Sequence, residues 1–505
     1  MGLHERVRGA EMTISAALHD ICLTDPDGPA LRFKDIRITK SEMYRLVHSA
    51  AAGLRKANIT RGDRVAMLAE NSPEIMLVYY ACARIGAIFI PLNANLTVSE
   101  VAYVARHSNA SLLVHDDALA AVAAEAAGEV RLVRAADVTQ SAHSDYDFAP
   151  EQWIGDFLVI YTSGTTGQPK AVVFSQSAEF EGNQALVELW GLGPKDVTLV
   201  ALPMGFLYGL STAAAAGIQG GGEVVILPKF HPRDVLEAMR DKGATVFQGV
   251  PTMFAMMLQY AEQNDLHFDL SGMRLLISAG APLPDELRER FQARFGKRID
   301  DYYALTEVRP VLGKYASEEA EVPRKSLGKA APGADIRIVD GDGRDVPTGE
   351  TGEVLVKAAS TLDRYLDNPE QSRAAFLDGY FRTGDLGHRD ADGFYFLTGR
   401  IKDIIIRGGA NIAPAEVEQV LASHPSVASA AVFGVRDEVF GEVPGAYVIL
   451  RPGQSLDAEA VIEHCKKTLA AFKVPGTIRA LEDFPLGKTG KVDKAALLEL
   501  WKANA

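Results

Sequence analysis

Apolar runs and helical patterns alternate through the first part of the chain. Pro73 after Ser72 is typical of a helix start, and Gly86 is typical of a helix end. The pattern predicts strands and helices in turn: strands over 65–68, 88–90 and 111–114, a helix over 73–85, and a helix opened by a capping box at 97–100. Such alternation indicates a mostly parallel sheet covered on both faces. The predicted fold class is α/β, with a large N-terminal region of doubly wound sheets.

After about residue 333, short strands and turns replace this alternation, which indicates a small β-rich subdomain. The turn Asp340-Gly-Asp-Gly343 predicts a hairpin, because the glycine and glutamate spacing of a calcium loop is absent. From Gly399 onward the pattern predicts a strand, a glycine turn, a helix from about Pro414, two more strands and a helix over 457–472. These elements suffice for a separate small α+β domain, so we predict two domains, 1–400 and 401–505.

One stretch, 197–222, carries no charge and is long enough to cross a bilayer. Pro203 and several glycines interrupt it, and its apolar character suits a buried strand, loop and helix equally well. We therefore predict a buried segment and no membrane partner.

The composition excludes several classes of function. The 52 Lys and Arg against 66 Asp and Glu give a net charge of −14, the wrong sign for a surface that binds nucleic acid throughout. Cys22, Cys82 and Cys465 form no redox or zinc motif, and the first residues lack the apolar run of a secretory signal. We expect a cytoplasmic protein with no nucleic-acid partner, and the sequence leaves a homodimer open.

A glycine- and hydroxyl-rich segment lies between two apolar runs, 157–160 and 171–174. Glycines let backbone N–H groups approach an anion, clustered hydroxyls can donate to phosphate oxygens, and Lys170 adds a mobile positive charge. The spacing differs from a Walker loop, because Lys170 follows Pro169 and precedes Ala171. The segment predicts a polyphosphate site formed by Thr162, Ser163, Gly164, Thr165, Thr166, Gly167 and Lys170.

This segment, YTSGTTGQPK, resembles the phosphate loop of the adenylate-forming superfamily, which contains acyl-CoA synthetases, stand-alone adenylation domains and luciferases. Motifs similar to others of that family follow in order: SAGAPL at 278–283, YALTE at 303–307, YFRTGDLG at 380–387, GRIKDIIIRGGANIAPAEVE from 399 and PLGKTGK at 485–491. The resemblance implies two half-reactions. A carboxylate attacks the α-phosphate of ATP to give an acyl-adenylate and pyrophosphate, and a thiol then displaces AMP.

The resemblance also implies roles for single residues. Tyr303 would stack on adenine, Thr306 would hold the α-phosphate, and Glu307 would bind the Mg²⁺ that bridges phosphates. Asp385 would accept both ribose hydroxyls, and Arg400 would contact ribose and phosphate. The other nucleotide positions that the resemblance implies are Gly280, Ala281, Pro282, Asp301 and Tyr302.

In the last motif, Lys491 matches the family's catalytic lysine. A mobile ammonium there would neutralise charge that develops on the α-phosphate and the attacking carboxylate. The resemblance further implies that the domain after residue 400 rotates about Lys402 between the half-reactions. This rotation would withdraw Lys491 and present Gly408 and Gly409 as a wall for the pantetheine of coenzyme A.

Two positions depart from the family pattern. Phe206 stands where a histidine is common, and Ala304 replaces the usual glycine after the stacking tyrosine. The candidate walls of the acid pocket are Phe206, Tyr208, Val250 and Ala304, although core packing explains such residues about as well. Arg309 is a candidate to meet a second carboxylate or a polar substituent, with a surface or interface ion pair as the alternative.

We interpret the chain as an AMP-forming carboxylate–CoA ligase that uses ATP, Mg²⁺ and coenzyme A on a small carboxylic acid. An adenylating enzyme that delivers its acyl group to a carrier-protein thiol is the close alternative. A nucleotide-binding regulator without chemistry is an alternative of another class. The sequence does not identify the acid.

Overall fold

The computed structural model describes residues 12–140, 153–162, 169–318, 321–485 and 492–503. The chain divides into two compact units, Met1–Asp335 with Val356–Phe381, and Ile336–Leu355 with Arg382–Ala505. Each unit is therefore discontinuous in sequence, and the second begins earlier than the single boundary predicted at residue 400. The predicted division at residue 400 stays a prediction.

The first unit contains a seven-stranded sheet. Its strands are, in spatial order, β18 (Arg364–Tyr365), β8 (Lys170–Ser175), β7 (Asp156–Thr162), β4 (Ile88–Leu92), β3 (Arg64–Leu68), β5 (Leu112–His115) and β6 (Arg131–Arg134). The strands from β7 to β6 are parallel to one another, whereas β8 runs antiparallel to both of its neighbours, β7 and β18. Ile88 and Ile90 face α4 (Val98–His107) and α5 (Ala120–Ala126), and Phe89 between them faces Tyr79 of α3 (Pro73–Ile85).

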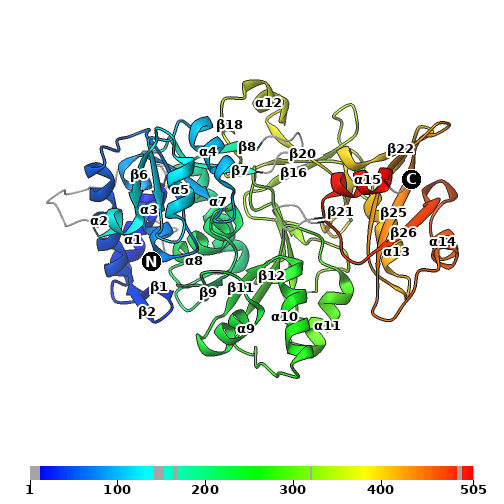
Figure 1. Ribbon diagram of the computed structural model, residues 1–505, viewed down its shortest axis with the longest axis horizontal. Helices are drawn as coiled ribbons and strands as arrows, with labels where there is room; N and C mark the ends of the chain where they lie inside the picture. The colour runs from blue at the N-terminus through cyan, green and yellow to red at the C-terminus, as the bar shows by residue number, and fades with distance from the viewer. Residues whose placement is uncertain (1–11, 141–152, 163–168, 319–320, 486–491, 504–505) are drawn as a thin grey trace. The chain divides into compact units, whose positions relative to one another are not determined.

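The first unit also contains a nine-stranded sheet, parallel from β13 to β1. Its spatial order is β15 (Lys329–Ala330), β14 (Leu312–Gly313), β13 (Asp300–Tyr303), β12 (Leu275–Ser278), β11 (Val246–Gly249), β9 (Val197–Val200), β10 (Glu223–Ile226), β1 (Pro29–Phe33) and β2 (Ile36–Thr39). Phe247 and Leu276 pack on α9 (Pro232–Asp241), α10 (Pro251–Gln263) and α11 (Asp285–Phe295), which lie side by side (Figure 1). Val246 and Ile277 face α7 (Gln176–Trp190) and α8 (Ala216–Gln219) on the opposite side.

Local signals explain several helix ends. Gly86 has a φ of 71°, which lets its N–H reach the carbonyl of Cys82 and end α3. The predicted capping box of α4 is present between Thr97 and Glu100. Three more helices of this unit, α1 (Ile14–Thr24), α2 (Lys40–Lys56) and α6 (Ala135–Thr139), pack around α3. The predicted α/β fold class with doubly wound sheets is confirmed.

The uncharged stretch 197–222 is buried, as predicted. It forms β9, a loop, a π-helix over Tyr208–Ala215, and then α8. None of the helices in the described part of the chain combines the length and the apolar character that crossing a bilayer requires.

The second unit carries part of one sheet and the whole of another. One sheet consists of β16 (Asp335–Val339), β17 (Gly352–Lys357), β20 (Tyr380–Arg389), β21 (Tyr395–Arg400) and β19 (Phe376–Leu377), and the unit boundary passes through β17 and β20. The other consists of β23 (Ala410–Ile412), β22 (Ile405–Arg407), β25 (Gly441–Leu450), β24 (Val427–Asp437) and β26 (Thr477–Leu481). The helices that complete the chain are α12 (Pro369–Ala374), which belongs to the first unit, and α13 (Pro414–Ala422), α14 (Ala458–Lys466) and α15 (Lys494–Ala503).

The predicted hairpin at 340–343 is confirmed, because Val339 bridges Asp345 and Asp340 N–H donates to the Arg344 carbonyl at 2.8 Å. The predicted helix over 457–472 is too long. It ends at Lys466, and a separate 3₁₀ turn covers Ala471–Lys473. The prediction failed because Leu469 beyond the helix end packs in the same core as Val461, so the apolar spacing continues past the break.

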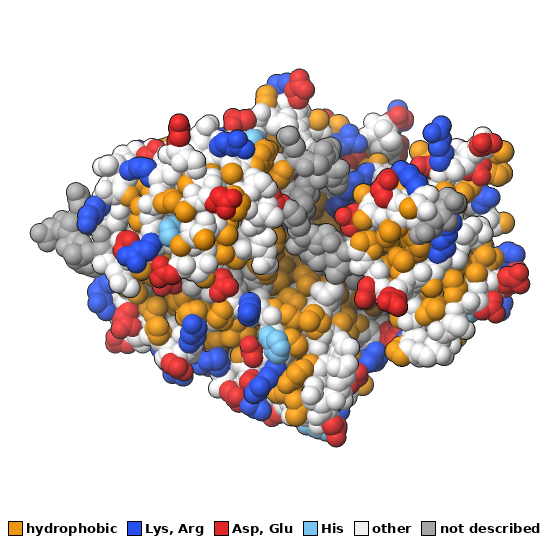
Figure 2. All heavy atoms as spheres, viewed as in Figure 1, with side chains coloured by type: hydrophobic (Ala, Val, Ile, Leu, Met, Phe, Trp, Pro, Cys, Tyr) orange, Lys and Arg blue, Asp and Glu red, His pale blue; other side chains and the backbone are white. Residues whose placement is uncertain are grey.

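Figure 2 shows Lys and Arg side chains interspersed with Asp and Glu over the visible face, as expected for an acidic chain without a basic tract. Cys22, Cys82 and Cys465 are buried free thiols. Burial raises the pKa of Cys22 and of Cys465 to about 11, so neither is a ready nucleophile.

Candidate active site

Three neighbouring parallel strands end at one edge of the nine-stranded sheet. β11 leads into Val250, β12 into Gly280, and β13 into the segment that carries Thr306 and Glu307. In parallel sheets, ligands bind beyond the carboxyl ends of the strands. Gly280 has a φ of 85°, and a Cβ there would lie 3.4 Å from Val250 Cγ1, so the turn brings two predicted site residues together.

The predicted phosphate loop connects β7 to β8, which are antiparallel neighbours with Thr162 opposite Lys170. Such pairing fixes both ends of the loop. Thr162 Oγ1 donates to the Lys170 carbonyl at 3.5 Å. The predicted loop residues Ser163, Gly164, Thr165, Thr166 and Gly167 lie outside the described residues.

Tyr365 joins the end of this loop to the predicted metal ligand. β18 pairs with β8, which places Tyr365 opposite Val172. The Tyr365 hydroxyl donates to Glu307 Oε1 at 2.9 Å, and Lys170 Nζ lies 5.4 Å from the centre of the Tyr365 ring. Burial and the negative charge of Glu307 both raise the pKa of Tyr365, so the hydroxyl keeps its proton and orients the carboxylate.

The residues around Glu307 fit a Mg²⁺ ion that is bound mainly by a substrate. No group of three potential metal-ligating side chains occurs within the described ranges, so the chain offers no closed cage there. Mg²⁺ in phosphate-transfer sites is typically held by one or two carboxylates together with substrate phosphates. A single oriented carboxylate beside the cationic end of a phosphate loop matches this arrangement.

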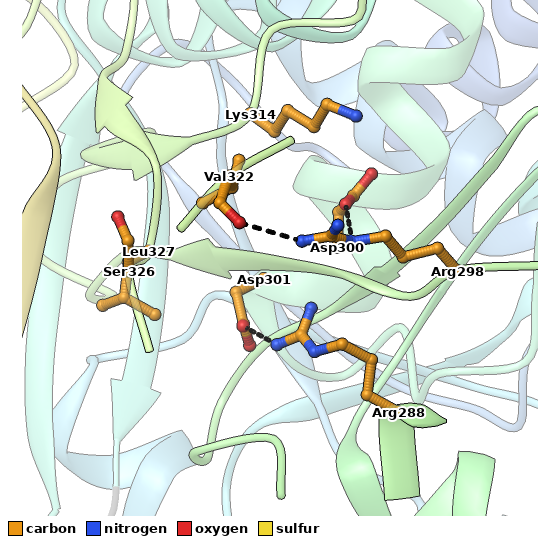
Figure 3. Close-up of a pocket in the computed structure, with 8 residues that line it drawn as sticks. All are labelled: Arg288, Arg298, Asp300, Asp301, Lys314, Val322, Ser326 and Leu327. Carbon is orange, nitrogen blue, oxygen red and sulfur yellow. Dashed lines mark hydrogen bonds and ion pairs between the residues drawn. The ribbon is translucent and has the colours of Figure 1, made fainter. Parts of the chain in front are cut away.

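Asp301, one of the predicted nucleotide residues, turns its side chain away from solvent. It lies beside a cavity of about 10 Å³, where it forms an ion pair with Arg288 of α11 (Figure 3). Burial raises the pKa of Asp301 and of its neighbour Asp300, and Arg288 opposes this shift at Asp301. The Asp301 carboxylate thus fixes β13 to α11, and its role in nucleotide binding stays a prediction.

Three of the four predicted acid-pocket walls border two core clusters. Tyr208 packs against the cluster that Val250 also borders and against the cluster that Ala304 also borders, and its hydroxyl donates to the Gly249 carbonyl at 3.3 Å. Phe206 lies half-buried two residues before Tyr208. Tyr303, the predicted stacking residue, is half-buried at the end of β13.

Arg309 is completely internal, with 1% of its surface exposed. Its Nη2 donates to Glu179 and to Ser211, and Glu179 also accepts a hydrogen bond from the Tyr79 hydroxyl at 2.7 Å. Arg309 forms an ion pair with Glu179, but the pair is buried inside the first unit, so it is neither the surface pair nor the interface pair that was the alternative. Arg309 Nε and Nη1 find no hydrogen-bond partner in the described part of the chain, and neither does Asn183 Nδ2.

The second unit holds the predicted ribose residues. Asp385 on β20 is buried opposite Arg400 on β21, and Arg400 Nε donates to Asp385 Oδ1 at 2.5 Å. Lys402, the predicted hinge, is exposed in a short 3₁₀ turn, Ile401–Asp403. Lys491, the predicted catalytic lysine, lies outside the described residues.

Gly408 and Gly409 form the predicted turn between β22 and β23. Their φ values of 55° and 86° are those of a two-residue hairpin turn, which explains the pair of glycines. A Cβ on Gly408 would lie 3.4 Å from Phe440, whose ring is 45% exposed. The Arg407 guanidinium lies 4.9 Å from the centre of this ring. The turn thus borders an exposed aromatic face with a cation above it.

Comparison with known proteins agrees with this geometry. The AMP-binding enzyme family matches residues 18–366, and the AMP-binding enzyme C-terminal domain matches residues 416–491. The chain belongs to the AMP-binding enzyme family. The first match spans the phosphate loop and Glu307, and the second spans residues from α13 to Lys491.

Relatives within the AMP-binding enzyme family align over nearly the whole chain. Indoleacetate–CoA ligase of Aromatoleum aromaticum is 33% identical and covers 94% of this chain and 96% of its own length. Feruloyl-CoA synthase of an Amycolatopsis species is 34% identical, with coverages of 93% and 95%. The structure of ATP-bound MatB from Rhodopseudomonas palustris superposes with a TM-score of 0.89 at 30% identity, covering 97% of this chain and 99% of that one.

Sequence reasoning missed Tyr365 and Glu179. Tyr365 stands in a two-residue strand that has no periodic pattern of its own, and only its pairing with β8 brings it to Glu307. Glu179 lies in the helix after the phosphate loop, where an acidic residue on an otherwise buried face was the available signal. The Tyr365 hydroxyl contacts Glu307 of the YALTE motif, and Glu179 contacts Arg309 just beyond that motif.

Proposed function

We propose that this chain is an AMP-forming carboxylate–CoA ligase that uses the residues described above. The observation that carries the proposal is Tyr365, which contacts both Lys170 and Glu307 and so joins the phosphate loop to the metal ligand. CoA ligases among its relatives align from end to end, which supports the same overall reaction.

In the first half-reaction, a carboxylate oxygen of the acid attacks the α-phosphorus of ATP. The bond from that phosphorus to the bridging oxygen breaks, and pyrophosphate leaves. Lys170 supplies positive charge near the phosphates, and Lys491 would neutralise the attacking carboxylate and the α-phosphate together. Glu307 would hold Mg²⁺, which would supply positive charge to the phosphate oxygens. Thr306 would hold the α-phosphate, and Tyr303 would stack on adenine.

In the second half-reaction, the sulfur of CoA attacks the acyl carbon, the thiol proton passes to solvent, and AMP leaves. The turn at Gly408 and Gly409 supports a pantetheine wall, because glycines permit close approach of a chain. The exposed ring of Phe440 under Arg407 suits the adenine and phosphates of CoA. Rotation of the part after residue 400 about Lys402 remains a proposal that rests on the family resemblance.

The alternatives fit less well. The relatives that align over the chain are mostly CoA ligases, among them those for indoleacetate, feruloyl and sulfoacetate substrates, which favours CoA as the acceptor. A fatty acid–acyl-carrier-protein ligase of Streptomyces coeruleorubidus is 32% identical, so the assay below separates the two acceptors. A silent regulator is not favoured, because the relatives that align over nearly the whole chain are ligases. Three buried free cysteines support a reducing compartment, and we propose the cytoplasm. A homodimer stays a prediction.

The proposal is tested by incubating the protein with ATP, Mg²⁺, CoA and pooled short, medium, aromatic and dicarboxylic acids, with mass spectrometry of the products. We expect one dominant acyl-CoA and AMP. Lys491→Ala should abolish acyl-adenylate formation, whereas the matched variant Lys488→Ala should retain it. Acyl-AMP without thioester would favour the carrier-protein alternative, and full adenylation by Lys491→Ala would overturn the mechanism.

A further inference from the structure

The strand end that leads into the predicted phosphate loop divides its side chains between the two faces of the seven-stranded sheet. Tyr161 of β7 is paired with Ala171 of β8, and the next residue, Thr162, is paired with Lys170. Successive side chains of a strand point to opposite faces. Tyr161 packs against the core cluster that contains Val159 and residues of α4, and α4 and α5 cover this face (Figure 1). Tyr161 therefore points to the helices, away from the face of Thr162.

The end of α4 holds the Tyr161 side chain. His107 is the last residue of α4, and its Nδ1 lies 2.8 Å from the Tyr161 hydroxyl oxygen. The ring of Tyr103, one helix turn earlier, stacks on His107 at 5.3 Å between centres and meets Tyr161 edge-on at 6.5 Å. A hydrogen bond from Ser108 also reaches Tyr161. Two polar contacts and an aromatic cluster thus fix one side chain of β7 to one helix end.

The Tyr161 hydroxyl is protonated in this surrounding. Burial raises the pKa of Tyr161, and the hydrogen bond from Ser108 opposes this shift only in part. The hydroxyl therefore keeps its proton near neutral pH and can donate it to Nδ1 of His107. A separation of 2.8 Å is that of a good hydrogen bond, so the loss of His107 removes a contact that Ser108 alone does not replace.

The opposite face of the same strand end carries the residues predicted to meet phosphate. Thr162 Oγ1 donates to the Lys170 carbonyl, so a shift of Tyr161 moves both described ends of the phosphate loop. We propose that His107 is a positioning residue for ATP, which acts through Tyr161 on the strand end that carries Thr162 and Lys170. This inference rests on the proposed function, because it takes Thr162 and Lys170 to bind the phosphates of ATP.

The test measures the two half-reactions separately in the full chain, with the acid that the pooled assay identifies. ATP–pyrophosphate exchange gives kcat/KM for ATP. Conversion of supplied acyl-adenylate to thioester gives the rate of the second half-reaction, which needs no ATP. His107→Leu should lower kcat/KM for ATP by about three- to tenfold, the range for one lost hydrogen bond, and leave the second rate within about twofold. A smaller folded fraction would lower both values equally.

Two further variants connect the effect to Tyr161. His107→Asn places an acceptor near the position of Nδ1, so it should recover most of the loss. Tyr161→Phe should lower kcat/KM for ATP at least as much as His107→Leu, and His107→Leu should add little in that background, because both changes remove the same bond. The matched control is His19→Leu, because His19 Nδ1 of α1 lies 2.7 Å from the Tyr44 hydroxyl of α2 in the same unit. It should leave both half-reactions unchanged.

Equal losses in the two half-reactions of His107→Leu would overturn the inference, and so would an unchanged kcat/KM for ATP. If the parent protein forms acyl-adenylate but His19→Leu lowers exchange as much as His107→Leu, the inference is wrong and the proposed function stands. If the parent protein forms neither acyl-adenylate nor thioester from any acid of the pool, the proposed function is wrong, and the inference falls with it.

Discussion

The buried pair of Arg309 and Glu179 leads to a sharp prediction about stability. Glu179→Gln keeps the shape of the side chain and an acceptor for Tyr79 and Ser211, but it leaves the guanidinium of Arg309 buried without a counter-ion. Removing one partner of a buried ion pair costs about 3–5 kcal/mol. The first unit has about 360 residues, and unfolding entropy is about 2.1 cal/mol/K per residue, so a loss of about 4 kcal/mol should lower its Tm by about 5 °C.

Arg309→Met should cost a similar amount, because it leaves the carboxylate unpaired. The double variant with both changes removes both charges, so it should lose far less than the additive value of about 10 °C. Differential scanning calorimetry measures this, and the first unit should give the transition of larger enthalpy because it has more residues. Asp342→Asn is the control, since it breaks an exposed pair with Arg344 and should shift Tm by less than about 1 °C. Additive losses in the double variant would refute the reasoning.

Three further outcomes test the active site. Tyr365→Phe should lower kcat/KM for acyl-adenylate formation by about 10–100-fold, because it removes a hydrogen bond to the charged carboxylate of Glu307. ATP–pyrophosphate exchange measures this rate, and an unchanged rate would show that other residues hold Glu307. Phe440→Ala should raise the KM for CoA several-fold and leave the rate of adenylation unaltered. The control Val439→Ala, at a side chain that is 82% exposed, should change neither value. Equal effects on both half-reactions would contradict the assignment of Phe440 to CoA binding. Asp385→Asn should raise the KM for ATP by about tenfold in initial-rate assays, and an unchanged KM would remove it from the ribose site.

The sequence predicts structure that depends on residues close together in the chain, and it does not predict contacts between distant segments. α3 and its end at Gly86 follow from residues within one helix turn, and so does the two-residue turn at Gly408. The motifs locate Lys170 and Glu307 through their resemblance to a family. Neither the local residue pattern nor the family resemblance predicts which side chains contact Lys170 and Glu307, because pairing between distant segments determines those contacts.

Arg309 shows this limit most clearly. Its position after Glu307 suggested a contact with a second carboxylate or polar substituent of the acid, or a surface or interface ion pair. Instead Glu179, 130 residues earlier, accepts its hydrogen bond in the interior. Similarly, the apolar pattern after residue 457 continues through a break that only the hydrogen bonds of the backbone reveal, since Thr468 bonds back to Cys465 and not to His464. The periodicity of apolar residues indicates which face of an element is buried. It does not indicate which residues of distant segments pack against that face.

The pairing of β18 with β8 has a consequence for the order of events during synthesis. The strands on both sides of the phosphate loop are complete once Ser175 has been made, whereas Tyr365 emerges from the ribosome about 190 residues later. At a synthesis rate of about 5–20 residues per second, roughly 10–40 s pass between the synthesis of β8 and that of β18, the strand that pairs with its edge. During that interval β8 is an open sheet edge, a site at which a nascent chain can pair wrongly. A nucleotide-binding site encoded early in the chain is thus finished late, and a chain truncated before residue 365 would expose the edge permanently.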